Sequence, residues 1–571
     1  RVLFRSVFIV SNPDNDYTGN FSLNTNPGIT PAAYSNTNIV TMRLGASEVI
    51  PNGLNKGNLV LSGGNAGGTT TLDLNGFNET VNSLVSYGTH SAVTITNTAV
   101  GTTSTLTIGD NHATAIVTEI AAASSFFGGA IRDTGTGLVA LTKIGEGTQT
   151  LTGANTYSGT TTISKGILQA GATNTLSANS DFVLADDPTA VLALTDGIAD
   201  YSQTIKSLAG GGTVNLGTIA AADTASSPGT RLTTGSTADT TYSGDIVGAG
   251  GLVKQGTGRL ILSGSNTYLG TTTISVGALQ IGDGGTTGTL GSGDVINEAA
   301  LVFNRSDTLE VGNTISGAGT LTQGGSGTTV LSAVHSYTGD TYVDAGTLKL
   351  ESASSNNNIA ASGIISVKTG ATFDVNGIST AGGFQVGGSQ LLSGESGGGG
   401  TVSGASTLLS GGSVAAGTDG TVGTLSFDSG LTTQSGSMWL VDLVGSASPG
   451  LESGDRIDVD GGALTIGSGT MLLINDADWN NGNTFTIATY SSLTAGSKFT
   501  FGIELNDLDT FATSNGQYQI RYGDGSFDGI TLTAVPEPTT LAFLTLGLAG
   551  YALVRRRRVR CSSVSEVAAG E

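Results

Sequence analysis

Two groups of carboxylates in this sequence are candidates for catalysis. Asp186 and Asp187 are adjacent, while Asp455, Asp458 and Asp460 lie within six residues of each other at the start of a polar run. Paired carboxylates supply the acid, the base or the nucleophile of enzymes that cleave glycosidic bonds. Acids that alternate along a strand beside a turn are also ordinary solvated surface. The clusters therefore raise one enzyme hypothesis, the cleavage of polysaccharides, against the simpler interpretation of surface charge.

Histidine and serine give no catalytic arrangement. The three histidines are His90, His112 and His335. They lack the spacing of a metal-binding motif, and His335 stands at a turn position that Asn155 and Asn266 hold elsewhere. Residues 394–398 match G-x-S-x-G, but no strand-to-helix turn surrounds them. We therefore expect no catalytic residue, no bound metal and no cofactor.

Composition excludes further classes of function. The 571 residues include 90 glycines, and only 12% are charged, with a net charge of −22. Such an acidic body repels nucleic acid and anionic membrane surfaces. The single cysteine, Cys561, lies close to the C-terminus, so the preceding chain holds neither a disulfide framework nor a zinc-cysteine site. A hydrophobic content of 37% indicates that the chain buries apolar side chains.

The sequence repeats itself. Residues 143–169 and 254–280 align without gaps, and weaker copies fill the spacers between them. A third strong copy aligns through Gly325, Gly327, Leu331, Tyr337, Gly339, Val343, Gly346 and Leu348. A unit that cannot bury its own apolar face has to stack on its neighbours, which is typical of a solenoid.

Each repeat reads as short strands joined by glycine corners. The segments 150–152, 161–164, 260–263 and 272–275 alternate apolar and hydroxyl side chains, as a half-buried strand does. Gly166, Gly277 and Gly346 lie between a strand and the next leucine, where a corner needs permissive backbone angles. The sequence predicts an all-β fold, a right-handed parallel β-helix (β-solenoid). An array of β-sandwiches remains the alternative.

The C-terminus has three consecutive parts. Pro536, Glu537 and Pro538 are followed by the uncharged segment 539–554. As a helix this segment is about 24 Å long, shorter than the hydrocarbon core of about 30 Å. A basic cluster follows, composed of Arg555, Arg556, Arg557, Arg558 and Arg560. Arginines beside an apolar span keep the tail in the cytoplasm, so the body lies outside. We expect a short C-terminal transmembrane helix that anchors weakly.

Two resemblances arise from these residues. The Pro536–Glu537–Pro538 motif, apolar segment and arginines resemble the PEP-CTERM sorting signal. That resemblance implies an exosortase-type membrane protease as partner, transient contact with the inner membrane, and cleavage near the motif. The repeats resemble the autotransporter-associated β-strand repeat, which implies a secreted, adhesin-like passenger. Together they imply an exported protein, first a membrane-anchored precursor and then part of the cell surface or extracellular matrix.

The chain divides into six expected segments. They are a sequencing-derived remnant (1–6), degenerate solenoid coils (7–137), autotransporter-associated repeats (138–350), further coils with a C-terminal cap (351–534), the sorting signal (535–560) and a cytoplasmic tail (561–571). The first residue is not Met, and we expect an export signal ahead of it.

The leading hypothesis is a non-enzymatic protein of adhesion or of biofilm matrix, with exopolysaccharide as a partner and no nucleic acid. One alternative is a β-helix polysaccharide lyase or hydrolase. The other is an autotransporter-like passenger, although the apolar segment 539–554 and the arginines stand where such a passenger would carry a membrane barrel.

Overall fold

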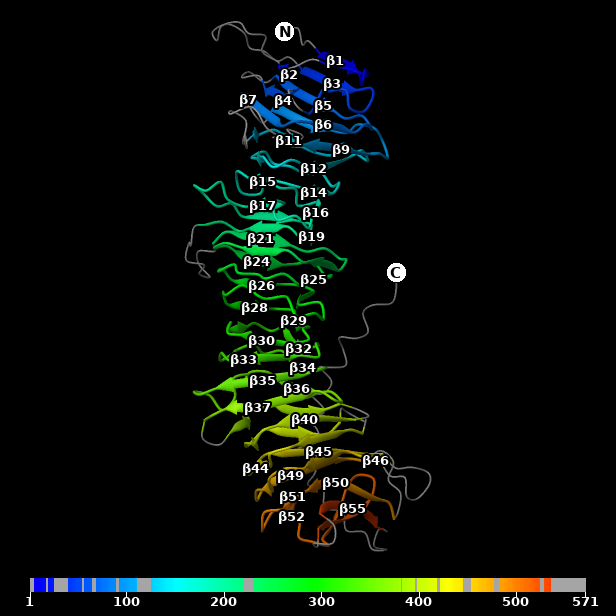
Figure 1. The fold of residues 1–571 in the computed structure, drawn as a ribbon. Helices are drawn as coiled ribbons and strands as arrows, with labels where there is room; N and C mark the ends of the chain where they lie inside the picture. The colour runs from blue at the N-terminus through cyan, green and yellow to red at the C-terminus, as the bar shows by residue number, and fades with distance from the viewer. Residues whose placement is uncertain are drawn as a thin grey trace. The chain divides into compact units, whose positions relative to one another are not determined.

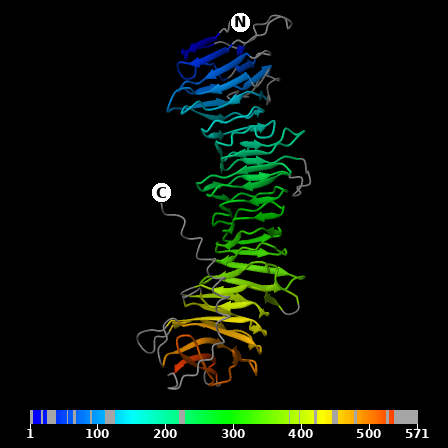
Figure 2. The ribbon, with the colours of Figure 1, turned by 180° about the vertical axis from the view of Figure 1, so that it is seen from behind.

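The protein consists of two compact units, Arg1–Arg305 and Ser306–Glu571. A computed structural model describes residues 5–16, 19–24, 39–53, 56–63, 68–88, 92–109, 125–218, 229–380, 383–395, 398–417, 422–444, 453–476, 482–523 and 528–535. Within each unit the strands stack coil upon coil, as two opposite views show (Figures 1 and 2). The division between the units falls inside residues 138–350, the run that the sequence assigned to strong repeats.

Unit 1 is built of parallel sheets whose neighbouring strands come from successive turns of the chain. Its longest sheet contains β6 (Glu79–Val81), β9 (Thr103–Ile108), β12 (Leu138–Lys143), β14 (Thr161–Ile163), β16 (Asp181–Leu184), β19 (Ser207–Gly210), β22 (Thr240–Tyr242), β25 (Arg259–Leu262), β27 (Ala278–Ile281) and β29 (Ala300–Phe303). A second sheet contains β10 (Ser125–Phe127), β13 (Thr148–Leu151), β15 (Ile167–Ala170), β17 (Val191–Ala193), β20 (Thr213–Asn215) and β23 (Asp245–Val247). A third contains β18 (Gln203–Ile205), β21 (Arg231–Thr234), β24 (Gly251–Lys254), β26 (Thr272–Ile274) and β28 (Val295–Asn297).

The first coils of unit 1 use two shorter sheets. One contains β1 (Arg5–Val10), β3 (Ile39–Leu44), β5 (Thr69–Asp73), β8 (Val93–Thr96) and β11 (Ala130–Ile131). The other contains β2 (Gly19–Asn24), β4 (Lys56–Gly63) and β7 (Leu84–Gly88). Their strands also pair in parallel.

Unit 2 continues the same construction. The sheet that we call the ladder sheet contains β30 (Thr308–Val311), β33 (Thr328–Leu331), β35 (Thr347–Ser352), β37 (Thr372–Ile378), β40 (Gly399–Ser403), β43 (Thr424–Phe427), β47 (Arg456–Val459) and β50 (Thr484–Tyr490). A second sheet contains β32 (Thr320–Gln323), β34 (Thr341–Val343), β36 (Ile364–Val367), β39 (Leu391–Gly394), β42 (Ser413–Ala415), β45 (Met438–Val444), β49 (Thr470–Asn475) and β51 (Phe499–Phe501). The smallest contains β38 (Phe384–Val386), β41 (Ser406–Leu408), β44 (Leu431–Thr433) and β48 (Leu464–Ile466), and the short strand β31 spans Ile315–Ser316.

The core consists of columns of buried side chains that lie level on successive coils. In the ladder sheet one column contains Leu309, Thr329, Leu348, Phe373, Val402, Phe427, Val459 and Tyr490. All eight side chains are buried. Burying an apolar side chain of this size contributes about 1.5–3 kcal/mol. Because side chains alternate along a strand, the residue before each of them points outward.

The coils differ in length while the register stays regular. Leu262 pairs with Ile281, 19 residues on, whereas Gly210 pairs with Tyr242, 32 residues on. The additional residues fall between strands in the sequence, and the strands themselves keep their pairing. Insertions in such loops cost little because loop-closure entropy grows slowly with length.

The predicted glycine corners are confirmed. Gly166, Gly277 and Gly346 have φ values of 70°, 73° and 58°, a region that residues with a Cβ rarely adopt. A Cβ on Gly277 would lie 2.4 Å from the carbonyl oxygen of Gly256 on the preceding coil. Glycine is therefore required both by the turn and by the close approach of two coils.

The last strands change direction. β45 pairs antiparallel with β46 (Ser453–Gly454), and β51 pairs antiparallel with β52 (Ile503–Glu504). β50 pairs antiparallel with β55 (Gly529–Val535), which pairs with β54 (Gln517–Tyr522) and then β53 (Thr510–Ala512). Aromatic side chains pack beneath this region, with Trp439 and Phe499 in an edge-to-face pair at 5.1 Å.

The parallel pairing confirms a β-solenoid and disfavours the sandwich alternative, whose sheets are antiparallel. The predicted transmembrane helix, residues 539–554, lies outside the described residues. In the part of the chain that the structure describes, no helix has the length and apolar character needed to cross a membrane.

Candidate functional surface

The predicted sorting residues lie outside the described part of the chain. They are Pro536, Glu537, Pro538, Arg555, Arg556, Arg557, Arg558 and Arg560. The last described strand, β55, ends at Val535, directly before the motif.

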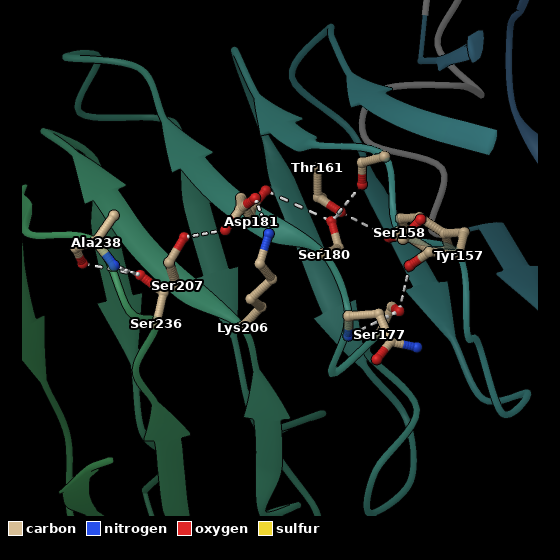
Figure 3. Close-up of polar contacts among 12 residues, drawn as sticks. Tyr157, Ser158, Thr161, Ser177, Ser180, Asp181, Lys206, Ser207, Ser236 and Ala238 are labelled. Carbon is tan, nitrogen blue, oxygen red and sulfur yellow. Dashed lines mark hydrogen bonds and ion pairs between the residues drawn. The ribbon is translucent and has the colours of Figure 1, made fainter. Parts of the chain in front are cut away.

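A tyrosine of each strong repeat is buried and hydrogen bonded within its own repeat. The hydroxyl of Tyr157 lies 2.7 Å from Oγ1 of Thr161, which in turn lies 2.8 Å from the hydroxyl of Ser180 on the next coil (Figure 3). The same tyrosine–threonine bond joins residues 268 and 272, and residues 337 and 341, at 2.6 Å. Burial raises the pKa of the Tyr157 hydroxyl well above its usual value. The chain of hydroxyls therefore joins coils and remains neutral.

The turn position held by asparagine in two repeats and histidine in the third is also buried. Oδ1 of Asn155 accepts the backbone N–H of Ile131, and Oδ1 of Asn266 accepts that of Ile246. In the third repeat Nδ1 of His335 accepts the backbone N–H of Ile315 at 3.2 Å. The predicted turn role of His335 is confirmed. His90 and His112 lie outside the described residues.

A third repeated position places a polar side chain inside the coil. Nζ of Lys143 donates to the carbonyls of Ile144, Gly145 and Lys165 at 2.6–3.1 Å. Lys254 makes the corresponding three bonds to Gln255, Gly256 and Val276 at 2.8–3.2 Å. In the third repeat Gln323 donates to the carbonyls of Gly325 and Gly327 at 2.8 and 3.2 Å. All three side chains are buried.

These repeated polar residues serve the fold. Each one satisfies backbone or side-chain groups at a corner of the coil, where ladder hydrogen bonds stop and buried carbonyls or amides would otherwise be unpaired. Burial lowers the pKa of Lys143 to about 8, but its three carbonyl partners occupy the ammonium fully. These buried residues therefore hold the coils in place, and the outward-facing side chains of the solenoid remain available to contact a ligand.

The first predicted carboxylate pair, Asp186 and Asp187, lies in a turn at the surface. Asp187 Oδ1 accepts both the backbone N–H and the hydroxyl of Thr189, at 2.8 and 2.6 Å. These bonds lower the pKa of the Asp187 carboxyl, with the Thr189 hydroxyl as the largest cause. Asp186 is exposed beside it. An ionised carboxylate committed to its own turn is poorly suited to donate a proton.

The three acids of the second predicted cluster lie in three different environments. Asp458 accepts both Arg456 Nε and Arg456 Nη2, at 2.7 and 2.8 Å, and Thr489 Oγ1 at 2.6 Å. Asp460 is exposed. Asp455 is buried and accepts the backbone N–H groups of Gly423 and Asp442. Burial raises the pKa of Asp455 to about 7.

Sequence reasoning missed the most deeply buried carboxylate. The Glu79 side chain accepts the backbone N–H groups of Val49 and Ile50 on the preceding coil, at 3.0 and 2.9 Å. Burial raises its pKa to about 8. Glu79 stands one residue before the outward-facing Thr80 in an otherwise ordinary strand, so its partners 30 residues earlier leave no local signal. Ser396 of the G-x-S-x-G match lies outside the described residues.

Outward-facing hydroxyls lie in register along the described surface. In unit 2 five threonines lie level on five successive coils of the ladder sheet, and we call them the threonine ladder: Thr308, Thr328, Thr347, Thr372 and Thr401. Ser426, Asp458 and Thr489 continue the same line on β43, β47 and β50. All five ladder threonines are half-buried or exposed. With strands about 4.8 Å apart, the hydroxyls form a regular row.

A charged column runs beside the threonine ladder, two residues further along each strand. It contains Glu310, Val330, Lys349, Asp374 and Ser403. Asp428 extends it, because its Oδ2 accepts the hydroxyl of Ser403 at 2.7 Å. The ammonium of Lys349 is paired with Glu351 at 2.5 Å. The column therefore presents the carboxylates of Glu310, Asp374 and Asp428 without a matching excess of positive charge.

Unit 1 has a shorter ladder of four threonines, the first of which, Thr80, donates its hydroxyl to Glu48 at 3.0 Å. Thr80, Thr107, Thr142 and Thr162 lie level on β6, β9, β12 and β14. Two residues beyond Thr107, Thr142 and Thr162 the sequence carries Gly109, Ile144 and Ser164. The two ladders thus share hydroxyl geometry and differ in the residues that stand two positions further along each strand.

Comparison with known proteins agrees with the two sequence resemblances. The family model "passenger-associated-transport-repeat" matches residues 141–170, 252–281 and 321–350, and the "PEP-CTERM protein-sorting motif" matches residues 534–558. A stretch of 109 residues, 18% of this chain, is 44% identical to the adhesin BmaC autotransporter of Brucella suis biovar 1 (strain 1330). That stretch covers 3% of the length of the relative.

Proposed function

The chain carries passenger-associated repeats in its body and a PEP-CTERM motif near its C-terminus, and from these features we propose an exported, non-enzymatic adhesin. Its ligand in this proposal is polysaccharide, at the cell surface or in the matrix of a biofilm. The observation that carries the proposal is the threonine ladder, because a regular row of hydroxyls suits many weak hydrogen bonds to a linear sugar polymer. The partial similarity to an adhesin supports it.

Binding through the ladder can be tested with the full-length protein and insoluble cellulose or chitin. Replacing Thr347, Thr372 and Thr401 together by valine keeps shape and β-propensity but removes three hydroxyls. At about 1 kcal/mol for each of the three hydrogen bonds lost, binding should weaken about a hundredfold. A matched control replaces the exposed loop residues Thr237, Thr257 and Thr287 by valine. Equal binding by the wild type, the ladder variant and the control would contradict the proposal.

The C-terminal motif sorts the protein in this proposal. An exosortase-type protease recognises Pro536–Pro538 and cleaves nearby, while the segment 539–554 sits briefly in the inner membrane as a short helix and the arginines stay in the cytoplasm. The match of the sorting-motif family at residues 534–558 supports this.

Intact-mass analysis of protein recovered from membranes and from culture supernatant tests the sorting. Protein in the supernatant should end near Pro536–Pro538 and lack the arginine cluster. Replacing the five arginines by glutamine should change the distribution between the fractions. Recovery only of protein that still ends at Glu571 would rule out cleavage.

The absence of enzymatic activity is part of the proposal. Hydrogen bonds already occupy the candidate carboxylates: Asp187 accepts Thr189, and Asp458 accepts Arg456 and Thr489. This supports the proposal, because a catalytic carboxylate has to face its substrate. Incubation of the protein with neutral and acidic glycans, followed by detection of reducing ends and unsaturated products, is the test. Product formation would favour a β-helix lyase or hydrolase instead.

Two structural details belong to the same proposal. We infer a right-handed winding, because crossovers between parallel strands are right-handed in about 98% of cases. We also infer that the antiparallel strands β53–β55 close one end of the solenoid and act as the cap expected within residues 351–534. Hydrogen exchange tests the capping role. It should be slow in β54 and β55 of the full chain, and deletion of residues 510–535 should make it faster throughout β47 and β50. Unchanged exchange in β47 and β50 would contradict the capping role.

A further inference from the structure

The ladder face of unit 2, formed by the threonine ladder and the charged column beside it, combines hydroxyls with carboxylates that outnumber the cations on the same strands. We propose that this face selects a linear glycan that carries protonated amino groups. The inference rests on the proposed polysaccharide binding and adds the chemical class of the ligand.

The first step of the argument is geometric. Glu310 and Asp374 lie in the same register column as Lys349, and each is two residues beyond a ladder threonine. Two residues along a strand span about 6.6 Å. A chain of sugars lying over the hydroxyl row therefore has carboxylates within reach of its substituents on one side.

The second step concerns the charge state of these carboxylates. Asp428 accepts the backbone N–H of Gly404 and the hydroxyls of Ser403 and Ser429. These donors lower its pKa against the opposing effect of desolvation, which is the largest single contribution. Asp374 accepts both the backbone N–H and the side-chain amide of Asn376, at 2.9 and 3.0 Å. For Asp428 the donors held towards its oxygens favour the ionised carboxylate.

The third step is the balance of charge across the face. The positive groups on these strands have partners already: Lys349 pairs with Glu351, and Arg456 pairs with Asp458. The single ammonium of Lys349 also attracts Asp374 and Glu310, so the acids of this face outnumber its cations, and Glu310 and Asp428 are exposed. The complementary ligand is cationic, since an anionic glycan is repelled and a neutral one gains hydrogen bonds to the carboxylates but no charge attraction.

The ladder of unit 1 provides an internal contrast. Two residues beyond Thr107, Thr142 and Thr162, where unit 2 has charge, the sequence of unit 1 carries Gly109, Ile144 and Ser164. Both units can therefore offer hydroxyl contacts to a sugar chain. We expect only the ladder face of unit 2 to discriminate between amino and acetylated sugars.

The experiment compares chitosan oligosaccharides, fully N-acetylated chito-oligosaccharides and polygalacturonate as ligands of the full-length protein. Mildly acidic pH protonates the chitosan amines. The expected order of affinity is chitosan above the acetylated ligand, with polygalacturonate weakest, and the preference for chitosan should fall as salt is added. The triple variant Glu310→Gln, Asp374→Asn, Asp428→Asn should bind chitosan about tenfold more weakly while its affinity for the acetylated ligand stays unchanged.

The matched control removes three exposed acids of unit 1, through Asp186→Asn, Asp283→Asn and Asp294→Asn. It changes net charge equally and should retain the preference for chitosan. Equal loss in both triple variants, or equal affinity of the wild type for amino and acetylated ligands, would overturn the amino-glycan inference while leaving polysaccharide binding intact. Failure of the wild type to bind any of the three ligands would overturn both.

Discussion

The hydroxyl of Tyr268 lies 2.6 Å from Oγ1 of Thr272, four residues ahead in the same repeat, and both side chains are fully buried. The same bond joins residues 157 and 161, and residues 337 and 341. The tyrosine occupies the turn before a strand and the threonine begins that strand, so the bond fixes the angle at which each coil re-enters a parallel sheet. Apolar packing alone gives no such directional constraint.

Tyr268→Phe should destabilise the repeat around it. The change removes one hydrogen bond and leaves the Thr272 hydroxyl in a buried site, at a cost of about 1–3 kcal/mol. Hydrogen exchange should accelerate in residues 252–281 while residues 321–350 stay protected, because solenoid stability is largely local. Tyr201→Phe is the control: the Tyr201 hydroxyl donates to Asp196 at 2.8 Å at the surface, and its loss should change stability by less than about 0.5 kcal/mol. Equal effects of the two changes would argue against a buried clamp.

The buried lysine of the second repeat should tolerate glutamine better than methionine. Gln323 makes the same kind of bonds to carbonyls in the third repeat, so Lys254→Gln should retain part of the hydrogen bonding. Lys254→Met fits the apolar stem but leaves the carbonyls of Gln255, Gly256 and Val276 without this donor, which should cost about 1–3 kcal/mol more than the glutamine change. Urea denaturation of the two variants measures the difference. Greater stability of the methionine variant would show that burying the ammonium costs more free energy than its hydrogen bonds contribute.

Local rules were sufficient to predict much of this fold. Alternation of apolar and hydroxyl residues located strands such as β14 and β26, and Gly277 marked a corner that the structure places at positive φ. His335 was recognised as a turn residue because it stands where the aligned repeats have asparagine. Each of these features is decided by a few adjacent residues, which a sequence displays directly.

The candidate surface required the structure. The coils vary from 19 to 38 residues between paired positions, so the sequence does not reveal that Thr347, Thr372 and Thr401 lie in one row. The interior position of Lys143 was missed for a different reason, since a lysine is rarely buried unless it finds partners. Its three carbonyls are presented by corners of two coils, a geometry with no signature in composition or spacing.

His335→Asn should make unit 2 more resistant to acid. Burial lowers the pKa of His335 from 6.5 to about 4, so the folded state binds the proton less readily than the unfolded chain. The stability of the wild type therefore falls as pH drops from about 6.5 to about 4, by about 3 kcal/mol in total from this group. The asparagine variant lacks this loss while keeping an acceptor for the Ile315 N–H. Urea midpoints measured against pH should diverge between the two proteins below about pH 6.5, and parallel curves would contradict the prediction.

Gly277→Ala should strongly destabilise unit 1. The residue has a φ of 73°, and a Cβ there would lie 2.4 Å from the Gly256 oxygen and 2.7 Å from the Gly258 oxygen. Both groups belong to the backbone of the preceding coil, so relief requires two coils to move apart, at a cost above about 2 kcal/mol. Gly312→Ala is the matched control, because nothing lies within 4 Å of its Cβ position, and it should be neutral or slightly stabilising through the unfolded chain. Thermal unfolding of both variants is the measurement, and a Gly277→Ala protein as stable as Gly312→Ala would show that the corner accommodates a side chain.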